Sequence, residues 1–296
     1  MTACYSLETL TMKEKLVSNY IDCLPENNLE KKYFKEIADE IRVALSWQKR
    51  TGSSDITIVA KNFGDPMPDV PGEKIIFMNA DEQYRIPDEV NDPDVKMIFK
   101  QYCREGQHEK LRPLPLGPAK DFVYTPNAFE DRIYDVTFIG QIAQNRAKFY
   151  GEIHDFLQDH SINSFFGLYQ GFNKGLDMES YSKILSNTKI AICPHGSASP
   201  ETFRFFEAMS ANCVVICAQQ PDNWIYRNAP YNVIANTNMT INGVAVGSTY
   251  HVVKTLLSDP KKLKLLADQS RQYYYGRVCA PPVAQYILSE IKEKDS

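Results

Sequence analysis

Long apolar runs and an excess of basic residues are both missing from this 296-residue sequence. No stretch approaches the ~18 continuous apolar residues that a membrane-spanning helix needs, so we expect no membrane span. The N-terminus has no basic region followed by a long apolar core, so we expect no secretory signal. The 33 basic residues are outnumbered by 37 acidic ones, and the net charge of −4 argues against non-specific nucleic-acid binding.

The seven cysteines follow no metal-binding pattern. No Cys-x-x-Cys pair and no Cys/His spacing typical of a metal site occurs. Their odd number, and the position of several within apolar runs, suit a reducing compartment, so we expect a cytoplasmic protein. Hydrophobic residues (43%) and aromatics (11%) are sufficient for packed cores, and the length favours two domains.

The first half of the chain is predicted to form a sheet of short, buried strands. Apolar runs at residues 56–60, 74–79 and 95–100 are too short for independent helices and indicate strands. Residues 112–117 are expected to add a fourth strand, which their prolines place at an edge or a strand end. A mixed apolar pattern over residues 30–48 predicts a helix before these strands.

The second half alternates strands and helices after a polar, turn-prone stretch at residues 118–132. Strands are expected at residues 135–140, 162–167, 190–193, 213–217 and 232–235, and helices at residues 144–158, 177–186, 249–257, 260–275 and 282–292. This alternation indicates a doubly wound parallel sheet. We predict an α/β protein with an N-terminal domain (1–125), a C-terminal domain (126–275) and a final helix (276–296) that packs back on the first domain. Two such domains would form a cleft at the carboxyl ends of their strands, where open α/β sheets bind ligands.

A strand, a glycine-containing loop, a helix and a second strand are predicted within residues 190–217. Ser199 has the N-cap position, Pro200 the first helical position and Glu201 the first turn, which together favour a helix start here. Unpaired backbone N–H groups and the helix dipole make such a start a natural site for a phosphate.

Arg204 and Glu207 follow in the same helix, three residues apart on one face. A cation and a carboxylate after an anion-binding helix start can hold a diphosphate and a ribose. The stretch therefore predicts a nucleotide-sugar site. The structural alternatives are an ion pair between the two side chains, and for Ser199 a purely capping role.

These elements resemble the GT-B class of glycosyltransferases and, within it, the exostosin-related group. The resemblance covers about residues 135–217 and rests on Phe138-Ile139-Gly140, Arg146, Gly196, Ser199-Pro200, Arg204, Glu207-Ala208 and Val214-Val215-Ile216. It implies two Rossmann-like domains with the donor site mainly in the second. Retaining members often carry two glutamates separated by seven residues, whereas Glu201 and Glu207 have five between them, which favours the inverting branch.

The resemblance also implies a set of donor-binding residues. They are Gly140, Arg146, His195, Gly196, Ser197, Ser199, Glu201, Arg204 and Glu207. Glu207 is expected to accept hydrogen bonds from ribose hydroxyls, and Arg204 to bind the diphosphate through its planar donor fork. The alternatives are a simple turn at Gly140, an exposed helical arginine at Arg146 and an incidental loop residue at His195.

An inverting transferase needs a base that deprotonates the acceptor hydroxyl. Asp81 and Glu82 follow the strand at residues 74–79, so we expect their carboxylates at its carboxyl end, facing the cleft. A capping aspartate and a solvated glutamate are the alternative reading, and Asp65 is a further candidate for the base.

No Asp-x-Asp motif follows a predicted strand of the second half, and Asp92-Pro93-Asp94 reads as a turn. Helix dipole and arginine can stabilise a leaving diphosphate in place of a metal, so we expect metal independence and no cofactor besides the donor substrate. The basic amphipathic stretch at residues 261–266 is interpreted as a surface helix, with at most peripheral membrane contact.

We therefore predict a glycosyltransferase that moves a sugar from a nucleoside diphosphate donor to a glycan or lipid-linked acceptor, in the synthesis of a cell-surface polysaccharide. One alternative is a sugar-nucleotide epimerase of similar two-domain fold, which would turn over its substrate without an acceptor. The other is a non-catalytic module that binds a nucleotide or a glycan.

Overall fold

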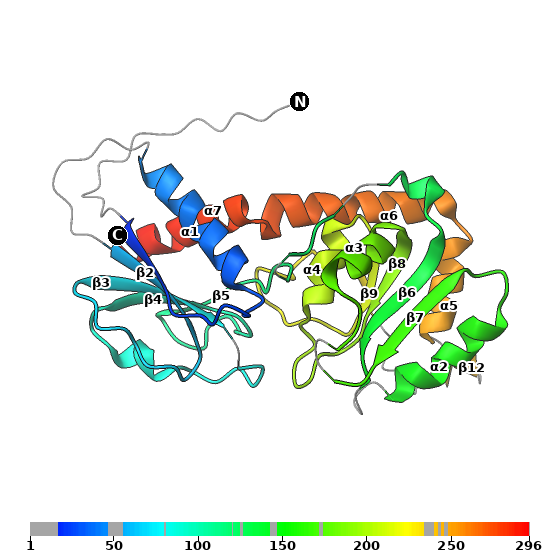
Figure 1. Ribbon diagram of the computed structural model, residues 1–296, viewed down its shortest axis with the longest axis horizontal. Coiled ribbons are helices and arrows are strands. Elements are labelled where there is room, and N and C mark those ends of the chain that lie inside the picture. Colours follow the sequence, from blue (N-terminus) through cyan, green and yellow to red (C-terminus); the bar gives the residue numbers. More distant parts are fainter. Residues whose placement is uncertain are drawn as a thin grey trace.

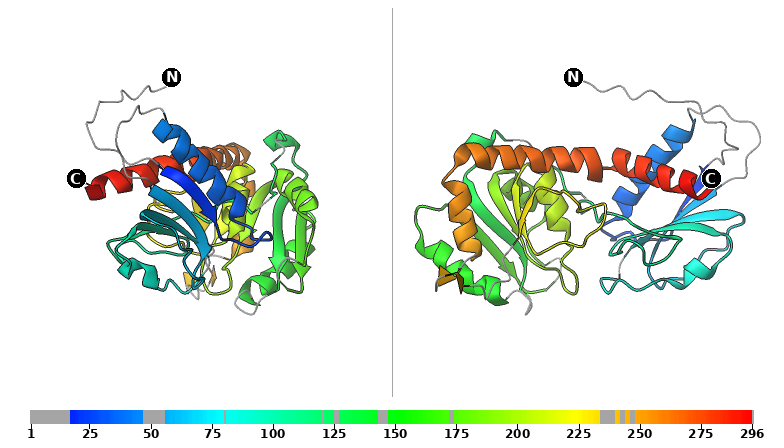
Figure 2. Two further views of the ribbon diagram at one scale, coloured as in Figure 1. Left: turned by 60° about the vertical axis from the view of Figure 1, so that its left-hand side comes forward. Right: turned by 180° about the vertical axis from the view of Figure 1, so that it is seen from behind.

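The computed structural model describes residues 17–46, 56–79, 81–119, 121–124, 127–142, 147–171, 174–233, 240–241, 244–245 and 248–295. Two five-stranded sheets lie side by side along the long axis, one in each half of the chain (Figure 1). A long helical run at the C-terminus passes over both halves, as the view from behind also shows (Figure 2). The predicted fold class, two α/β domains built on parallel sheets, is confirmed.

The N-terminal sheet has the strand order β1-β2-β3-β4-β5, with every pair parallel. Its strands are β1 (Val17–Asp22), β2 (Ile56–Asn62), β3 (Glu73–Asn79), β4 (Val95–Lys100) and β5 (Leu111–Pro113). The predicted buried runs form β2, β3 and β4, and the proline-containing strand β5 lies at an edge. Edge strand β1 was missed because its sequence, VSNYID, contains no continuous apolar run.

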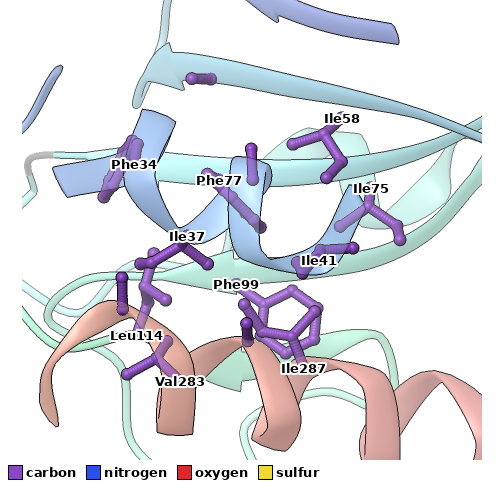
Figure 3. Packing of buried hydrophobic residues seen from close by; sticks show 14 of the residues in the cluster. Phe34, Ile37, Ile41, Ile58, Ile75, Phe77, Phe99, Leu114, Val283 and Ile287 are labelled. Carbon is purple, nitrogen blue, oxygen red and sulfur yellow. The ribbon is translucent and has the colours of Figure 1, made fainter. Parts of the chain in front are cut away.

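One face of this sheet packs against two helices from opposite ends of the chain, α1 (Lys31–Ser46) and α7 (Ala280–Asp295). Figure 3 shows the shared core, in which Phe34 and Ile37 of α1 and Val283 of α7 meet at the sheet. The ring of Phe77 lies edge-on to Phe34, with ring centroids 5.8 Å apart. Because α7 completes this core, the last helix of the chain is part of the N-terminal domain.

The C-terminal sheet is also parallel and has the order β10-β9-β8-β6-β7. Its strands are β6 (Tyr134–Gln141), β7 (Ser164–Tyr169), β8 (Thr188–Cys193), β9 (Val214–Cys217) and β10 (Tyr231–Val233). The chain moves from β6 outward to β7 and then returns to place β8 on the other side of β6. The carboxyl ends of β6 and β8 therefore flank a topological switch point, the usual ligand site of a doubly wound sheet.

Helices cover both faces of the C-terminal sheet. The helices are α2 (Ala147–Gln158), α3 (Met178–Ser186), α4 (Phe203–Ser210), α5 (Thr249–Leu257) and α6 (Pro260–Tyr273). Residues of α2 and α5 belong to one apolar core, and residues of α3 and α4 to the other. The smaller elements are the 3-10 helices η1 (Asp88–Asn91) and η2 (Phe129–Asp131), the hairpin strands β11 (Thr240–Ile241) and β12 (Val244–Ala245), and the π-helix η4 (Tyr274–Val278) that joins α6 to α7.

The helix predicted to open at Ser199 begins later, and this part of the prediction was wrong. Helix α4 starts at Phe203, and its N-cap residue Thr202 makes no capping hydrogen bond through its side chain. The Ser199 hydroxyl instead accepts a hydrogen bond from the backbone N–H of Glu201, at 3.1 Å, which holds a turn ahead of the helix.

Polar contacts join the two domains besides the shared helix α7. The Trp224 indole N–H donates to the carbonyl oxygen of Pro113 at 3.1 Å, and the Asn223 amide donates to that of Cys103 at 3.2 Å. Arg227 forms an exposed ion pair with Glu105 at 2.8 Å. The edge strand and loops of the N-terminal sheet are thereby held against the segment between β9 and β10.

Candidate active site

A cavity of about 630 Å³ lies between the domains, at the carboxyl ends of both sheets. Its N-terminal wall consists of Asn27, Asn28, Leu29, Glu30, Asn79, Asp81, Glu82 and Tyr102. Its C-terminal wall consists of Ile139, Gly140, Gln141, Tyr169, Gly171, Lys174, Gly175, Leu176, Met178, Tyr181, Gly196, Ser197, Glu201, Thr202, Phe203, Arg204 and Glu207. The linker residue Ala119 completes the lining. This volume is in the range of small-molecule and cofactor sites.

Arg204 of α4 lies against the end of β6, beside Gly140. Its Nε donates a hydrogen bond to the carbonyl oxygen of Ile139. A Cβ atom at Gly140 would lie only 2.6 Å from a terminal nitrogen of the guanidinium, so this close approach requires glycine. The arginine is thus held at the switch point between β6 and β8, facing the cavity. A planar fork of N–H donors in this place suits a phosphate or a diphosphate.

Glu207 lines the same wall but is 3% exposed and already engaged on both oxygens. Oε2 accepts a hydrogen bond from the Tyr181 hydroxyl at 2.6 Å, and Oε1 accepts one from the backbone N–H of Ala119 at 3.1 Å. Burial raises the pKa of Glu207, an effect that these two hydrogen bonds and the nearby Arg204 oppose. Any ribose contact would use the remaining lone pairs of this carboxylate, since each oxygen accepts more than one hydrogen bond.

The loop after β8 brings some of the predicted residues to the cavity and keeps others away from it. Gly196 and Ser197 line the cavity. A Cβ at Gly196 would lie 2.8 Å from the carbonyl oxygen of Ser199, so the turn requires glycine. Ser199 is fully buried and His195 half-buried, and neither belongs to the lining; the His195 Nδ1 lies 3.0 Å from the carbonyl oxygen of Gly196.

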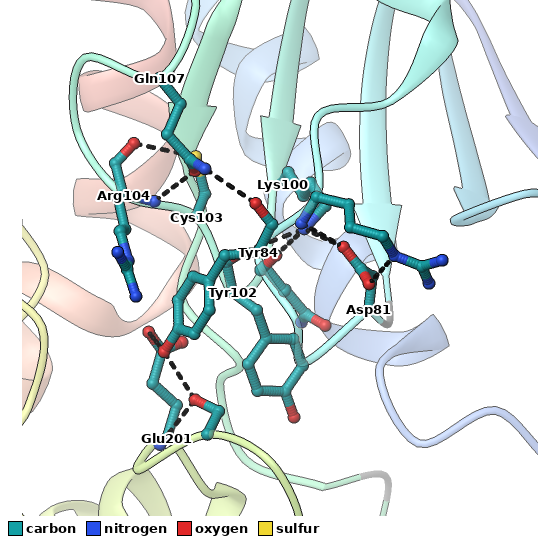
Figure 4. Close-up of polar contacts among 11 residues, drawn as sticks. Asp81, Tyr84, Lys100, Tyr102, Cys103, Arg104, Gln107 and Glu201 are labelled. Atoms are coloured by element: carbon teal, nitrogen blue, oxygen red, sulfur yellow. Dashed lines mark hydrogen bonds and ion pairs between the residues drawn. The ribbon is translucent and has the colours of Figure 1, made fainter.

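Glu201 is buried at the boundary between the domains, where Tyr84 reaches it from the N-terminal side (Figure 4). The Tyr84 hydroxyl lies 2.7 Å from the Ser199 hydroxyl and donates to Glu201 at 3.3 Å. Burial raises the pKa of Glu201 to about 8, against the opposing effects of Tyr84 and the Lys100 ammonium. This carboxyl is therefore protonated over much of the neutral range.

Asp81 lies at the carboxyl end of β3, held by two cations (Figure 4). Arg85 donates to it through Nε and through its backbone N–H, both at 2.7 Å, and the Lys100 ammonium lies 3.3 Å away. The side chains of Asp81 and Lys100 are both fully buried. Burial alone would raise the pKa of Asp81, but the hydrogen bonds and charges of Arg85 and Lys100 lower it overall.

Glu82 makes a contact across the cleft, accepting a hydrogen bond from the backbone N–H of Ala198 at 2.6 Å. Asp81 and Tyr84 on either side have left-handed backbone conformations, with φ of 67° and 58°. Such conformations in non-glycine residues cost energy and collect at functional loops. Asp81 and Glu82 both line the cavity, and their role as base stays a prediction.

Two groups of lining residues escaped the sequence analysis. The first begins at Tyr169, the last residue of β7, and continues with Gly171, Lys174 and Gly175 in the segment before α3; two glycines soon after a predicted strand were the available signal. The second precedes α1 and contains Asn28 and Glu30; the Glu30 carboxylate contacts Asn79 at the carboxyl end of β3. Its signal was hidden because the preceding strand β1 had not been predicted.

Arg146, the predicted second phosphate cation, lies outside the described residues. Among the residues that are described, no group of three or more His, Cys, Asp or Glu side chains could hold a metal ion. Over the same residues, every helix is too short or too polar to cross a bilayer.

No protein-family model matches the chain, and no curated protein sequence matches it. Solved structures of similar fold include a glycosyltransferase from Rickettsia africae ESF-5, with 10% identity and a TM-score of 0.49 over 96% of this chain and 100% of that one. An α1,3-fucosyltransferase has the same identity and TM-score over 97% and 93% of the two chains. Anabaena Alr3699/HepE, solved in complex with UDP and glucose, has 9% identity and a TM-score of 0.45 over 87% and 81%. These likenesses concern the fold.

Proposed function

We propose that this chain is a glycosyltransferase that moves a sugar from a nucleoside diphosphate sugar to a glycan or lipid-linked acceptor. The observation that carries the proposal is the position of Arg204, at the switch point of the C-terminal sheet in a cavity shared by both domains. A guanidinium there can hold the diphosphate while the acceptor approaches from the opposite domain. Closure of such a cleft excludes water and brings the two substrates together.

Arg204 and the backbone N–H groups at the start of α4 are proposed to stabilise the negative charge that develops on the leaving diphosphate. We propose that this arrangement works without a metal ion, so turnover is expected to survive EDTA. The inverting course and a role in cell-surface polysaccharide synthesis are proposed from the resemblance over residues 135–217. The anomeric configuration of the product, read by NMR, tests the stereochemistry.

The test of the donor site is a calorimetric panel of UDP, GDP, CMP and dTDP and their sugar conjugates, applied to the wild type, Arg204→Ala and Arg42→Ala. One nucleotide family should bind the wild type, and Arg204→Ala should weaken it at least tenfold, because charge-assisted hydrogen bonds contribute about 1.5–3 kcal/mol. Arg42 lies on α1 outside the cavity, so its removal should leave the affinity unchanged. Binding of no nucleotide, or equal affinity in all three proteins, would overturn the proposal. Conversion of a donor sugar to its epimer without an acceptor would support the epimerase instead.

A further inference from the structure

The N-terminal wall holds a buried carboxylate that neither the sequence analysis nor the proposed donor site uses. Glu30 lies immediately before α1 and is 6% exposed, yet it lines the cavity. A carboxylate in this position faces the space between the domains rather than bulk solvent. Burying such a group is costly, and a cavity-facing carboxyl that forms no salt bridge within the described part of the chain is therefore a candidate for chemistry.

A network of amides fixes Glu30 at the ends of two strands. The Asn79 side chain, at the end of β3, donates to Glu30 Oε2 at 3.2 Å and to Asn62 Oδ1 at 3.3 Å. The Asn28 side chain accepts from the backbone N–H of Glu30 at 2.9 Å. Asn62, at the end of β2, in turn donates to Asp65 at 2.9 Å. Positions held by packed strands and hydrogen bonds are the precise ones that catalysis needs.

The two carboxylates predicted from the sequence are held differently. Asp81 is paired with Lys100 and Arg85, and those cations stabilise its ionised form and make it a weak base. Glu82 is used in a contact with the Ala198 backbone. Burial raises the pKa of Glu30 to about 7, against partial opposition from Asn79 and from backbone N–H groups. A base works best when its pKa is close to the working pH, which Glu30 satisfies and Asp81 does not.

Several other titratable groups share the cavity with Glu30. Those among the lining residues are Asp81, Glu82, Tyr102, Tyr169, Lys174, Tyr181, Glu201, Arg204 and Glu207. Next to the cavity, the Lys31 ammonium is held by Asp22 at 3.3 Å and Glu26 at 2.7 Å, and that of Lys100 by Asp81. These two lysines are therefore paired with other carboxylates, and the pKa of Glu30 follows mainly from its burial, its backbone N–H partners and Asn79.

We propose that Glu30 is the catalytic base of the transfer and that the acceptor group is a hydroxyl of a carbohydrate. This rests on the proposed glycosyltransferase function. The carboxylate takes the hydroxyl proton while the acceptor oxygen forms its bond to the anomeric carbon. The bond from that carbon to the diphosphate oxygen breaks, and its electron pair leaves with the nucleoside diphosphate.

The chemistry of the surrounding wall supports a carbohydrate in this place. Asn27, Asn28 and Asn79 line the cavity next to Glu30. Each amide offers both a donor and an acceptor, a combination that matches the neighbouring hydroxyls of a sugar. Asn79 is a positioning residue: it donates a hydrogen bond that orients Glu30 and that partly opposes the rise in its pKa caused by burial.

The test compares Glu30→Gln with Glu36→Gln, a substitution at an exposed position of α1 outside the cavity. Donor affinity is measured by calorimetry, and turnover by donor hydrolysis and by transfer to a panel of methyl glycosides. Glu30→Gln should lower kcat by roughly 10²–10⁴-fold with donor affinity unchanged, because a positioned base contributes about that factor. In the wild type and in Glu36→Gln, activity should rise with pH around pH 7, and in Glu30→Gln this rise should be absent. Retained turnover in Glu30→Gln would overturn the proposal, as would loss of the rise in Asp81→Asn or Glu82→Gln alone.

Two further measurements separate this inference from the proposed function. Isotope-edited infrared titration needs no substrate: a glutamate carboxyl titrating near pH 7 should vanish in Glu30→Gln, whereas that of Glu201 near pH 8 should remain and should vanish in Glu201→Gln. An infrared titration identical in the wild type and Glu30→Gln would overturn the assignment. In Asn79→Ala the rise of activity should move to higher pH. The hydrogen bond from Asn79 favours the ionised form of Glu30, so its loss raises the pKa of this carboxyl. Absence of nucleotide binding in the wild type would instead overturn the proposed function, whatever the infrared titration shows.

Discussion

The two walls of the cavity differ in the chemistry they offer, although both are formed at the carboxyl ends of parallel strands. The C-terminal wall presents a guanidinium, Arg204, and close-approach glycines at Gly140 and Gly196. The N-terminal wall presents the carboxylate Glu30 and the amide of Asn79. One wall therefore suits an anion, and the other suits a neutral molecule rich in hydroxyls. The sheet geometry is the same in both halves, so the chemical difference between the walls comes from their side chains.

The carboxylates of the cavity are held in two different ways. Buried Asp81 is neutralised by Lys100 and Arg85. Glu201 and Glu207 receive hydrogen bonds from the hydroxyls of Tyr84 and Tyr181, and Glu30 receives one from the amide of Asn79. Ion pairing lowers the pKa of Asp81, whereas burial raises the pKa of each of the other three.

The largest expected effect comes from Lys100→Met, which removes the buried cation of the N-terminal wall. The Lys100 ammonium contacts Asp81 at 3.3 Å and also donates to the carbonyl oxygens of Gln101 and Tyr102. Its loss would leave a buried carboxylate and two carbonyls with a partner missing. The unfolding free energy should fall by about 3–5 kcal/mol, measured by urea denaturation. Lys35→Met on the exposed face of α1 should change it by less than about 1 kcal/mol, and similar losses for the two would contradict this view of the wall.

Gly140→Ala is expected to reduce donor affinity on the C-terminal wall without unfolding the protein. The new Cβ would lie 2.6 Å from the end of the Arg204 side chain, which is flexible and can move away. Displacing the guanidinium should weaken nucleotide binding about tenfold, measured by calorimetry. Gly151→Ala on α2 has nothing within 4 Å of its Cβ and should leave the affinity unchanged. Unaltered affinity in Gly140→Ala would show that the position of Arg204 does not matter.

Much of the fold could be predicted from the sequence because short apolar runs specify buried strands. Residues 74–79 and 95–100 formed β3 and β4 nearly as predicted, since both strands are covered on both faces. Edge strand β1 has neither a continuous apolar run nor a regular alternation of polar and apolar residues, and only its pairing with β2 reveals it. The start of α4 was placed too early because Ser199 and Pro200 carry strong local signals. In the structure the Ser199 hydroxyl instead holds a local turn with the Glu201 backbone and makes a tertiary contact with Tyr84.

The candidate site was harder to predict, because it joins residues far apart in the chain. Arg204 and Gly140 were found through a local pattern, and the structure brings them within contact distance. Glu30 had no motif, since its setting depends on Asn79, 49 residues later in the sequence. Which carboxylate is paired with a cation cannot be read from Asp81 and Glu82 themselves. It depends on Lys100, which approaches from the next strand of the sheet.

Glu201→Gln should flatten the dependence of stability on pH. The pKa of Glu201 is about 8 in the folded protein, above its value of ~4.3 in an unfolded chain. The folded state therefore binds this proton more tightly, and its stability falls as the pH rises from ~4.3 through 8, by about 1.4 kcal/mol for each pH unit. Glu30 acts in the same direction up to about pH 7, and burial raises the pKa of Glu207 as well, so Glu201 is identified by the difference between the wild type and Glu201→Gln rather than by the slope itself. Measured by urea denaturation, the unfolding free energy of the wild type and of Glu36→Gln should fall between pH 7 and pH 8 by more than that of Glu201→Gln. An equal fall in all three proteins would exclude titration of Glu201 in this pH range.

The smallest effect is expected from Tyr84→Phe, which removes one hydroxyl that joins the two walls. Its contacts with Ser199 and Glu201 are neutral or partly charged hydrogen bonds, so their loss should cost about 1 kcal/mol of unfolding free energy. Because the Tyr84 hydrogen bond lowers the pKa of Glu201, the variant should also shift the Glu201 titration to higher pH. Tyr275→Phe, which removes a hydroxyl from a half-exposed ring away from the cavity, is the matched control and should change neither quantity. If Tyr84→Phe lowers stability but leaves the titration in place, Tyr84 contributes to the contact between the walls without setting the charge on Glu201.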